Sequence, residues 1–231
     1  MEVRVQSQPA YSVATLVLQL DETVHIDAGS VAMLSPGIEV KARMPGGAVR
    51  SALRHALAHE PLFMAECTAR LDQAWVMSAP RFPGDVAVVQ LDDQHPMLVE
   101  AGSVLGFHHG VEVDARYAGL ANVTLHEGAT ALLCKGNGAL LVCAYGGIER
   151  FELGDGDDVI IDTGYLLAWS KSCKFQVGAL GGLKTALLTH EGLVARITGP
   201  GVVYVQSRAQ RNLREWLIPA MGPNVNGKVS S

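Results

Sequence analysis

The sequence has few of the features that mark several large classes of protein. Among its 231 residues there are only four cysteines, Cys67, Cys134, Cys143 and Cys173, and no two of them form a Cys-x-x-Cys pair. This spacing argues against a disulfide framework or a zinc site, and we expect buried, reduced thiols. Apolar runs stay well short of the ~20 residues that a membrane-spanning helix needs. The first residues also lack the layout of a signal peptide. The sequence therefore predicts a soluble, cytoplasmic protein.

Positive charge is also scarce. The chain has 18 Lys and Arg residues against 23 Asp and Glu residues, for a formal net charge of −5. This balance argues against nucleic acid as a partner, because binding to a phosphate backbone needs a basic surface. Glycine motifs for phosphates or dinucleotides and the Gly-x-Ser-x-Gly elbow of hydrolases are missing from the sequence as well. We therefore assign no catalytic, cofactor-binding or metal-binding residue, and the sequence favours a protein that is not an enzyme.

Glycine, by contrast, is abundant and recurs at matching places in three β-prone segments. Residues 28–31 and 101–104 both read Ala-Gly-Ser-Val, and Gly164 occupies the same place after a third apolar run. Each pattern predicts a strand, a turn at the glycine and a second strand, because glycine adopts a positive φ without a Cβ penalty.

A second marker is the dipeptide His-Glu, which follows each segment, at 59–60, 126–127 and 190–191. The two markers recur at intervals of roughly 60 to 75 residues, which indicates internal repeats. The dipeptides would either form a polar ring around a pseudo-threefold axis or serve the folding of each repeat, and we favour the second interpretation. The predicted units are one β domain over 1–210, with repeats at about 10–84, 85–154 and 155–208, and a C-terminal helix and disordered tail over 211–231.

The second half of each repeat is predicted to form a β-hairpin. Residues 136–138 read Gly-Asn-Gly and residues 199–201 read Gly-Pro-Gly, and both lie between β-prone runs. Glycine-rich turns of this kind are typical of hairpins. The overall expectation is an all-β sandwich or barrel.

Two short helices, at about 48–59 and 208–217, are predicted beside the strands. The first is rich in Ala, Leu and Arg, which are good helix formers. The second carries Leu213, Trp216 and Leu217 at helical spacing and is expected to end at Pro219. Three arginines would share one face of this helix and are candidates for contact with an acidic partner, although exposed arginines on a terminal helix are ordinary: Arg208, Arg211 and Arg214.

Histidine pairs are the remaining candidates for chemistry. His55 and His59 lie one turn apart on the first predicted helix, a spacing that can bind a metal from one face. Because no third ligand is evident, we interpret the pair as part of a solvated helix face. His108 and His109 are adjacent, so their side chains are expected to point to opposite faces of a strand. A cupin-like metal enzyme is an alternative, although the His-x-His pattern of cupins is absent.

Several short motifs occur in the order known from one family. They are Gly46-Gly47, Ala79-Pro80, Pro83-Gly84-Asp85, Ala144-Tyr145-Gly146, Asp162-Thr163-Gly164 and Gly199-Pro200-Gly201. Over about residues 10–208 the chain resembles the altered-inheritance-of-mitochondria protein 24 family, which includes many bacterial members of unassigned function. Pro61 departs from the glycine that is usual there.

The resemblance implies a β-sandwich of the tryptophan RNA-binding attenuation protein (TRAP) type, with three such units per chain. It also implies oligomers, and we expect homotrimers. The family has no agreed catalytic residues, so none is carried over. We predict a non-enzymatic oligomeric binding or scaffold protein. The alternatives are a cupin-like metal-dependent enzyme and, by analogy of fold alone, a binder of RNA or a small ligand.

Overall fold

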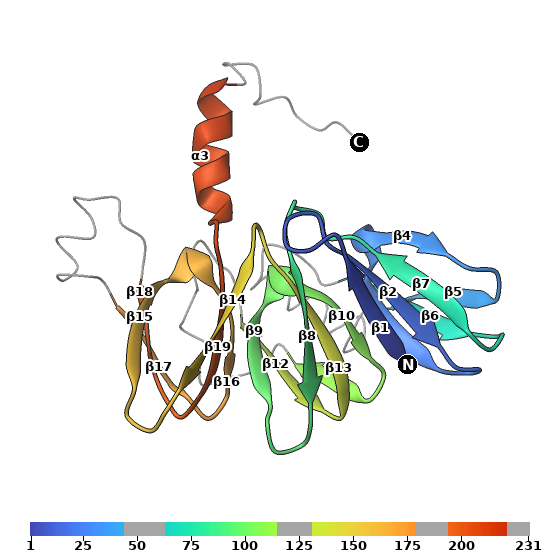
Figure 1. Ribbon diagram of the computed structural model, residues 1–231, viewed down its shortest axis with the longest axis horizontal. Helices are drawn as coiled ribbons and strands as arrows, with labels where there is room; N and C mark the ends of the chain where they lie inside the picture. The colour runs from blue at the N-terminus through green and yellow to red at the C-terminus, as the bar shows by residue number, and fades with distance from the viewer. Residues whose placement is uncertain (44–62, 115–130, 179–193, 221–231) are drawn as a thin grey trace.

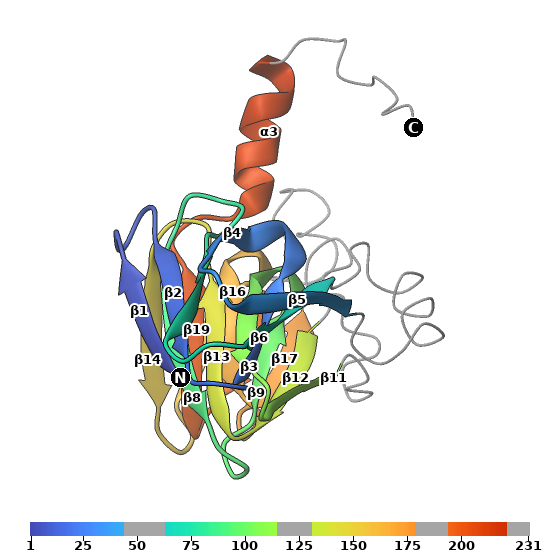
Figure 2. The ribbon, with the colours of Figure 1, turned by 90° about the vertical axis from the view of Figure 1, so that its right-hand side faces the viewer.

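The strands form three β-sandwiches in a row along the longest axis of the molecule (Figure 1). The computed structural model describes residues 1–43, 63–114, 131–178 and 194–220. Helix α3 (Gln210–Ala220) projects away from the strands, and it does so in the view turned by 90° as well (Figure 2). The all-β fold predicted from the sequence is confirmed.

The first sandwich packs two sheets around an apolar core. One sheet has the order β1-β2-β7-β4, and the other begins β5-β6-β3. Leu16, Ile26 and Val76 are fully buried between the sheets, since alternate residues of each strand face inward. The strands are β1 (Glu2–Gln6), β2 (Val13–Leu18), β3 (Thr23–Asp27), β4 (Val31–Leu34), β5 (Ile38–Arg43), β6 (Met64–Ala69) and β7 (Ala74–Ser78).

The second and third sandwiches repeat this strand order. In the second, β8-β13-β10 faces β11-β12-β9, and in the third β14-β19-β16 faces β15-β18-β17. The second contains β8 (Val86–Leu91), β9 (Met97–Glu100), β10 (Val104–His108), β11 (Val111–Asp114), β12 (Ala131–Gly136) and β13 (Gly138–Cys143). The third contains β14 (Ile148–Leu153), β15 (Asp158–Asp162), β16 (Leu166–Ser170), β17 (Lys174–Gly178), β18 (Val194–Thr198) and β19 (Gly201–Gln206).

Neighbouring sandwiches share sheets. Strand β3 of the first sandwich pairs with β10 of the second, and β9 of the second pairs with β16 of the third, so two sheets have six strands each. We call these pairings the first and second junctions. Both are antiparallel. Phe107 lies opposite His25 in the first, and Trp169 lies opposite Leu98 in the second.

The predicted hairpins are wrong. The chain does turn sharply at residues 136–138, where Gly136 has φ 99° and Gly138 has φ 143°. Strand β12, however, pairs with β9 and β11, whereas β13 pairs with β8 and β10. The turn therefore carries the chain from one sheet to the other. A glycine turn reverses the chain in either case, and the packing of two sheets decides which strands pair.

Two helix predictions have different outcomes. The predicted helix at 48–59 lies outside the described residues. Helix α3 forms close to the predicted place, but its expected end at Pro219 is wrong, because the helix continues to Ala220. Proline removes one backbone donor, and in the last turn this loss leaves the preceding hydrogen bonds of the helix in place.

Candidate functional site

The repeated glycines lie in three 3₁₀ turns, each of which leads from one sheet to the other within a sandwich. The turns are 28–30, 101–103 and 163–165, and each follows an acidic residue. We call them the first, second and third acid turns. Their acids are Asp27, Glu100 and Asp162.

The acids favour glycine in the second and third turns, whereas in the first a Cβ on Gly29 would meet the guanidinium of Arg81. The carboxylate of Glu100 accepts a hydrogen bond from the N–H of Gly102 at 3.0 Å, and that of Asp162 accepts one from Gly164 at 2.9 Å. A Cβ on either glycine would lie 3.2–3.3 Å from the carboxylate. The expected positive φ is wrong for Gly29, Gly102 and Gly164. Close approach of the acid, rather than a left-handed backbone, favours glycine here.

Arginines bind the acids of two turns. In the first turn, Arg81 Nη2 lies 3.2 Å from Asp27 Oδ1, and Ser30 Oγ donates to Asp27 Oδ2 at 2.7 Å. In the third turn, Arg211 of α3 forms an ion pair with Asp162. Because both acids are partly buried, these contacts hold the turns more firmly than exposed ion pairs would.

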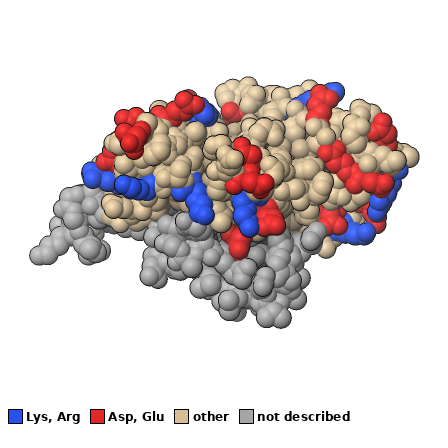
Figure 3. Space-filling view, turned by 90° about the horizontal axis from the view of Figure 1, so that it is seen from below, with Lys and Arg blue, Asp and Glu red and all other residues tan. Residues whose placement is uncertain are grey.

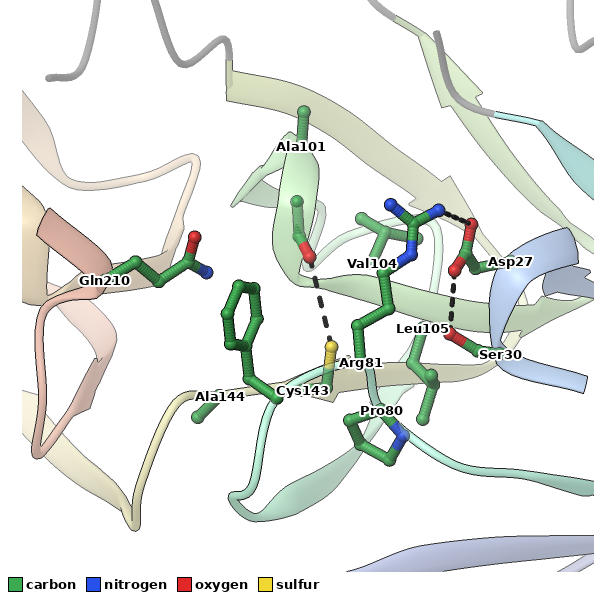
Figure 4. A pocket seen from close by; sticks show the side chains of 12 residues that line it. Asp27, Ser30, Pro80, Arg81, Ala101, Val104, Leu105, Cys143, Ala144 and Gln210 are labelled. Atoms are coloured by element: carbon green, nitrogen blue, oxygen red, sulfur yellow. Dashed lines mark hydrogen bonds and ion pairs between the residues drawn. The ribbon is translucent and has the colours of Figure 1, made fainter. Parts of the chain in front are cut away.

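A cavity of about 250 Å³ lies between the first and second acid turns. Figure 4 shows Arg81 directed toward Asp27 on one side and Gln210 on the opposite side, with Cys143 between them. Burial, followed by the nearby Glu100 carboxylate, raises the pKa of the Cys143 thiol to about 12. The thiol is therefore protonated at neutral pH and is a poor nucleophile.

A second cavity, of about 420 Å³, lies between the second and third acid turns and α3. Arg211, Arg214 and Leu217 of α3 form one wall, and Thr163 lies in the turn opposite. The Thr163 hydroxyl is buried and has no hydrogen-bond partner among the described residues. Gln206 closes the floor by donating from Nε2 to the carbonyl of Gly164 at 2.9 Å. The lining thus combines two arginines and the carboxylate of Glu100 with the apolar side chains of Phe82, Leu166, Leu213 and Leu217.

The three arginines predicted to share a face do not act together. Arg211 and Arg214 line the larger cavity, whereas Arg208 precedes α3 and donates to the carbonyl of Ser207 at 2.9 Å. The helix begins two residues later than predicted, so Arg208 lies outside its periodicity. Sequence spacing alone did not show that Arg211 reaches back to Asp162, 49 residues earlier.

His108 and His109 lie side by side, and the prediction of opposite faces is wrong. Their ring centroids are 4.1 Å apart, because strand β10 ends at His108 and the chain turns there. His108 Nδ1 accepts from the N–H of Gly110 at 3.2 Å, and its Nε2 lies 3.3 Å from Glu22. Burial, followed by the charge of His109, lowers the pKa of His108. His108 is therefore neutral at physiological pH, and its Nδ1 accepts the hydrogen bond that holds the turn at Gly110.

Metal and nucleic-acid sites receive no support from the described residues. Within them, no three His, Cys, Asp or Glu side chains converge as a metal site would require. His55, His59 and the His-Glu pairs at 59–60, 126–127 and 190–191 lie outside the described residues. On the face seen from below, acidic and basic side chains are interspersed rather than gathered by sign (Figure 3). No helix in the described segments is long and apolar enough to cross a bilayer.

These features define an all-β protein of three linked sandwiches, with acid turns and two cavities between neighbouring sandwiches. The chain belongs to the family described as mitochondrial biogenesis AIM24, whose match covers residues 3–208. It is 21% identical over 215 residues to an uncharacterized protein of Streptococcus pyogenes serotype M6, covering 90% of this chain and 86% of that protein. The crystal structure of S. pyogenes protein SPYM3_0169 has the same fold, with a TM-score of 0.76 and 19% identity over 95% of this chain and 99% of the other.

Proposed function

We propose that this protein is a non-enzymatic scaffold or binding module that works as an oligomer in the cytoplasm. The observation that carries the proposal is the exposure of large apolar side chains on two edge strands. Met33 and Leu34 on β4 are 55% and 39% exposed, and Ile160 on β15 is 52% exposed. Large aliphatic side chains on an open sheet edge favour pairing with another strand.

The form of the assembly is part of the same proposal. Each sandwich is taken to be of the TRAP type, and three copies are taken to form the oligomer. Shared sheets between sandwiches support this, since the chain already joins its units by strand pairing. Assembly of several copies would bring several sets of acid turns and cavities together in one particle.

Light scattering after size exclusion tests the proposal. One chain has a mass of 24.5 kDa, and a homotrimer would have about three times this mass. Measurements across a series of micromolar concentrations should give the oligomer at each. A strictly monomeric protein over that range would contradict the scaffold.

The larger cavity favours a second candidate function, the binding of a small anionic ligand. Arg211, which also pairs with Asp162, and Arg214 line the cavity beside the carboxylate of Glu100, and the buried hydroxyl of Thr163 has no partner among the described residues. Titration calorimetry with citrate and with inorganic phosphate should detect binding, and Thr163→Val should weaken it by several fold. Heat changes that are equal in the two proteins, or absent from both, would refute this candidate.

The cupin-like alternative is tested by elemental analysis of the purified chain. Stoichiometric iron, manganese or zinc that is lost in the His55→Ala and His59→Ala variants would favour the metal enzyme over the scaffold.

A further inference from the structure

At the two ends of the row, one strand each lacks the partner that a neighbouring sandwich gives to its counterparts. β10 and β16 each pair with a strand of the preceding sandwich, whereas β4, which has the same place in the first sandwich, pairs within the described chain with β7 alone. β3 and β9 each pair with a strand of the following sandwich, whereas β15, which has the same place in the third, pairs there with β18 alone. The other edge strands differ. β5, β11 and β17 are edges in all three sandwiches, and β8 and β14 lack only a counterpart of β1, a strand that belongs to the first sandwich itself.

The residues on these two strands are exposed where their counterparts are buried. Leu34 is 39% exposed, but Phe107 and Trp169 in the matching positions are 4% and 0% exposed. Ile160 is 52% exposed, but its counterparts His25 and Leu98 are 8% and 3% exposed. These positions are therefore exposed at the two ends of the row and buried where a neighbouring sandwich adds a strand beside them.

Local landmarks fix which residues correspond. All three sandwiches have a register shift at the same place, before Met33, before Gly106 and before Ala168. This aligns Leu34 with Phe107 and Trp169. The acid turn that follows β15 aligns Asp162 with Asp27 and Glu100, and so aligns Ile160 two residues earlier with His25 and Leu98.

The two open strands lie at opposite ends of the molecule, so they do not pair with each other inside one chain (Figure 1). A partner that fits both ends is a second copy of this chain. We propose that β4 of one copy pairs antiparallel with β15 of the next, with Leu34 opposite Ile160 and Met33 opposite Ile161. The pairing continues the two internal junctions, and it specifies the interface of the oligomer proposed above, on which it rests.

The proposed pair occupies the same register position as the facing residues of the two junctions. Phe107 stacks on His25 with ring centroids 5.0 Å apart and planes 6° apart, and Trp169 faces Leu98. Leu34 against Ile160 would be an aliphatic pair at the same position. Since the contact joins two different surfaces, it is heterologous, and a closed ring is the form of assembly that would leave neither strand open.

Charged substitutions test the interface. Leu34→Asp and Ile160→Asp should each lower the mass in light scattering from that of the oligomer to that of one 24.5 kDa chain. Val40→Asp is the matched control, because Val40 is 46% exposed on β5, an edge strand in every sandwich. The control should keep the mass of the unmodified protein, and circular dichroism should show that all three variants are folded.

Cysteine pairs test the register and the direction. Leu34→Cys and Ile160→Cys variants, mixed and mildly oxidised, should form a disulfide-linked dimer, since opposed residues bring their Cβ atoms to about 4.5–5.5 Å. Each variant alone, and Leu34→Cys mixed with Val40→Cys, should remain unlinked.

The outcomes separate this inference from the proposed function. An oligomer that survives Leu34→Asp and Ile160→Asp, with no cross-linked dimer, would overturn the pairing and leave the scaffold standing. A cross-link in Leu34→Cys alone would show a two-fold contact and overturn the head-to-tail arrangement. A monomeric unmodified protein would overturn both.

Discussion

The two internal junctions and the two open edges occupy the same strand positions but carry different side chains. At the junctions, Phe107 and Trp169 are aromatic and buried, whereas Leu34 at the open edge is aliphatic and partly exposed. An aromatic side chain buries more apolar area, so it suits a contact that forms whenever the chain folds. A smaller aliphatic side chain exposes less apolar area to water before a second copy arrives. At the junctions these side chains belong to the cores of their own sandwiches and are also flanked by a strand of the neighbouring one, whereas Leu34 lacks that second strand.

The largest effect is expected from removal of the second junction's aromatic. Trp169 is fully buried and stacks on Phe175 with ring centroids 4.5 Å apart. Trp169→Ala should lower the free energy of unfolding by about 3–5 kcal/mol, since it removes buried area and leaves a cavity. Urea denaturation at low protein concentration measures this. Leu34→Ala should change the same quantity by less than about 0.5 kcal/mol, and a loss as large as that of Trp169→Ala would break the comparison.

A smaller loss is expected where the first junction brings two backbones close together. A Cβ added at Gly106 would lie 2.8 Å from the carbonyl oxygen of His25 on β3. Gly106→Ala should therefore destabilise the fold by about 1–3 kcal/mol, because β3 and β10 must move apart. Gly178→Ala at the end of β17 is the control, since a Cβ there meets nothing within 4 Å. Equal thermal midpoints for the two variants would contradict the close approach at the junction.

Mild acid should lower the stability that the first junction contributes to the fold. His108 lies opposite Val24 in this junction and faces Glu22, His109 and, less closely, the N-terminal ammonium. Its pKa is lowered from the ordinary value of 6.5, by burial first and then by His109. The unfolded chain thus binds a proton at a higher pH than the folded chain does.

The stability contributed by neutral His108 is therefore fully present above pH 6.5 and declines as the pH falls below it. Urea midpoints between pH 7.5 and 5.5 should decrease in the unmodified protein and decrease less in His108→Gln. Parallel pH profiles for the two proteins would show that another group dominates.

The smallest effect is expected at Met33. Its counterparts at the junctions are Gly106 and Ala168, so the proposed interface has a large side chain where both junctions have a small one. Methionine is flexible and can turn aside. Met33→Ala should leave the mass in light scattering unchanged. Because it removes a side chain that is larger than its counterparts, it should strengthen the association slightly and lower the dissociation constant of the oligomer by a few fold at most. Dissociation into single chains would show that Met33 itself makes the contact.

The features that were predicted well depend on residues close together in sequence. The strands around Gly29, Gly102 and Gly164 form where alternating apolar residues and glycine indicate them, and the helix near 210–220 follows from the spacing of Leu213 and Leu217. The features that were missed join distant residues. Arg211 reaches Asp162, and the chain at 136–138 passes between sheets instead of forming a hairpin. The same glycine-rich turn suits a hairpin within one sheet and a crossing from one sheet to the other, so the sequence pattern did not distinguish the two.

By itself, the sequence determined an all-β chain with a recurring unit, because the period of glycine, acid and apolar residues is written into short segments. Only the tertiary structure decided which strands share a sheet, what lies against the glycines of the acid turns, and which edges lack a neighbouring sandwich. Those features depend on backbone hydrogen bonds and packing between sheets, which place residues far apart in sequence side by side.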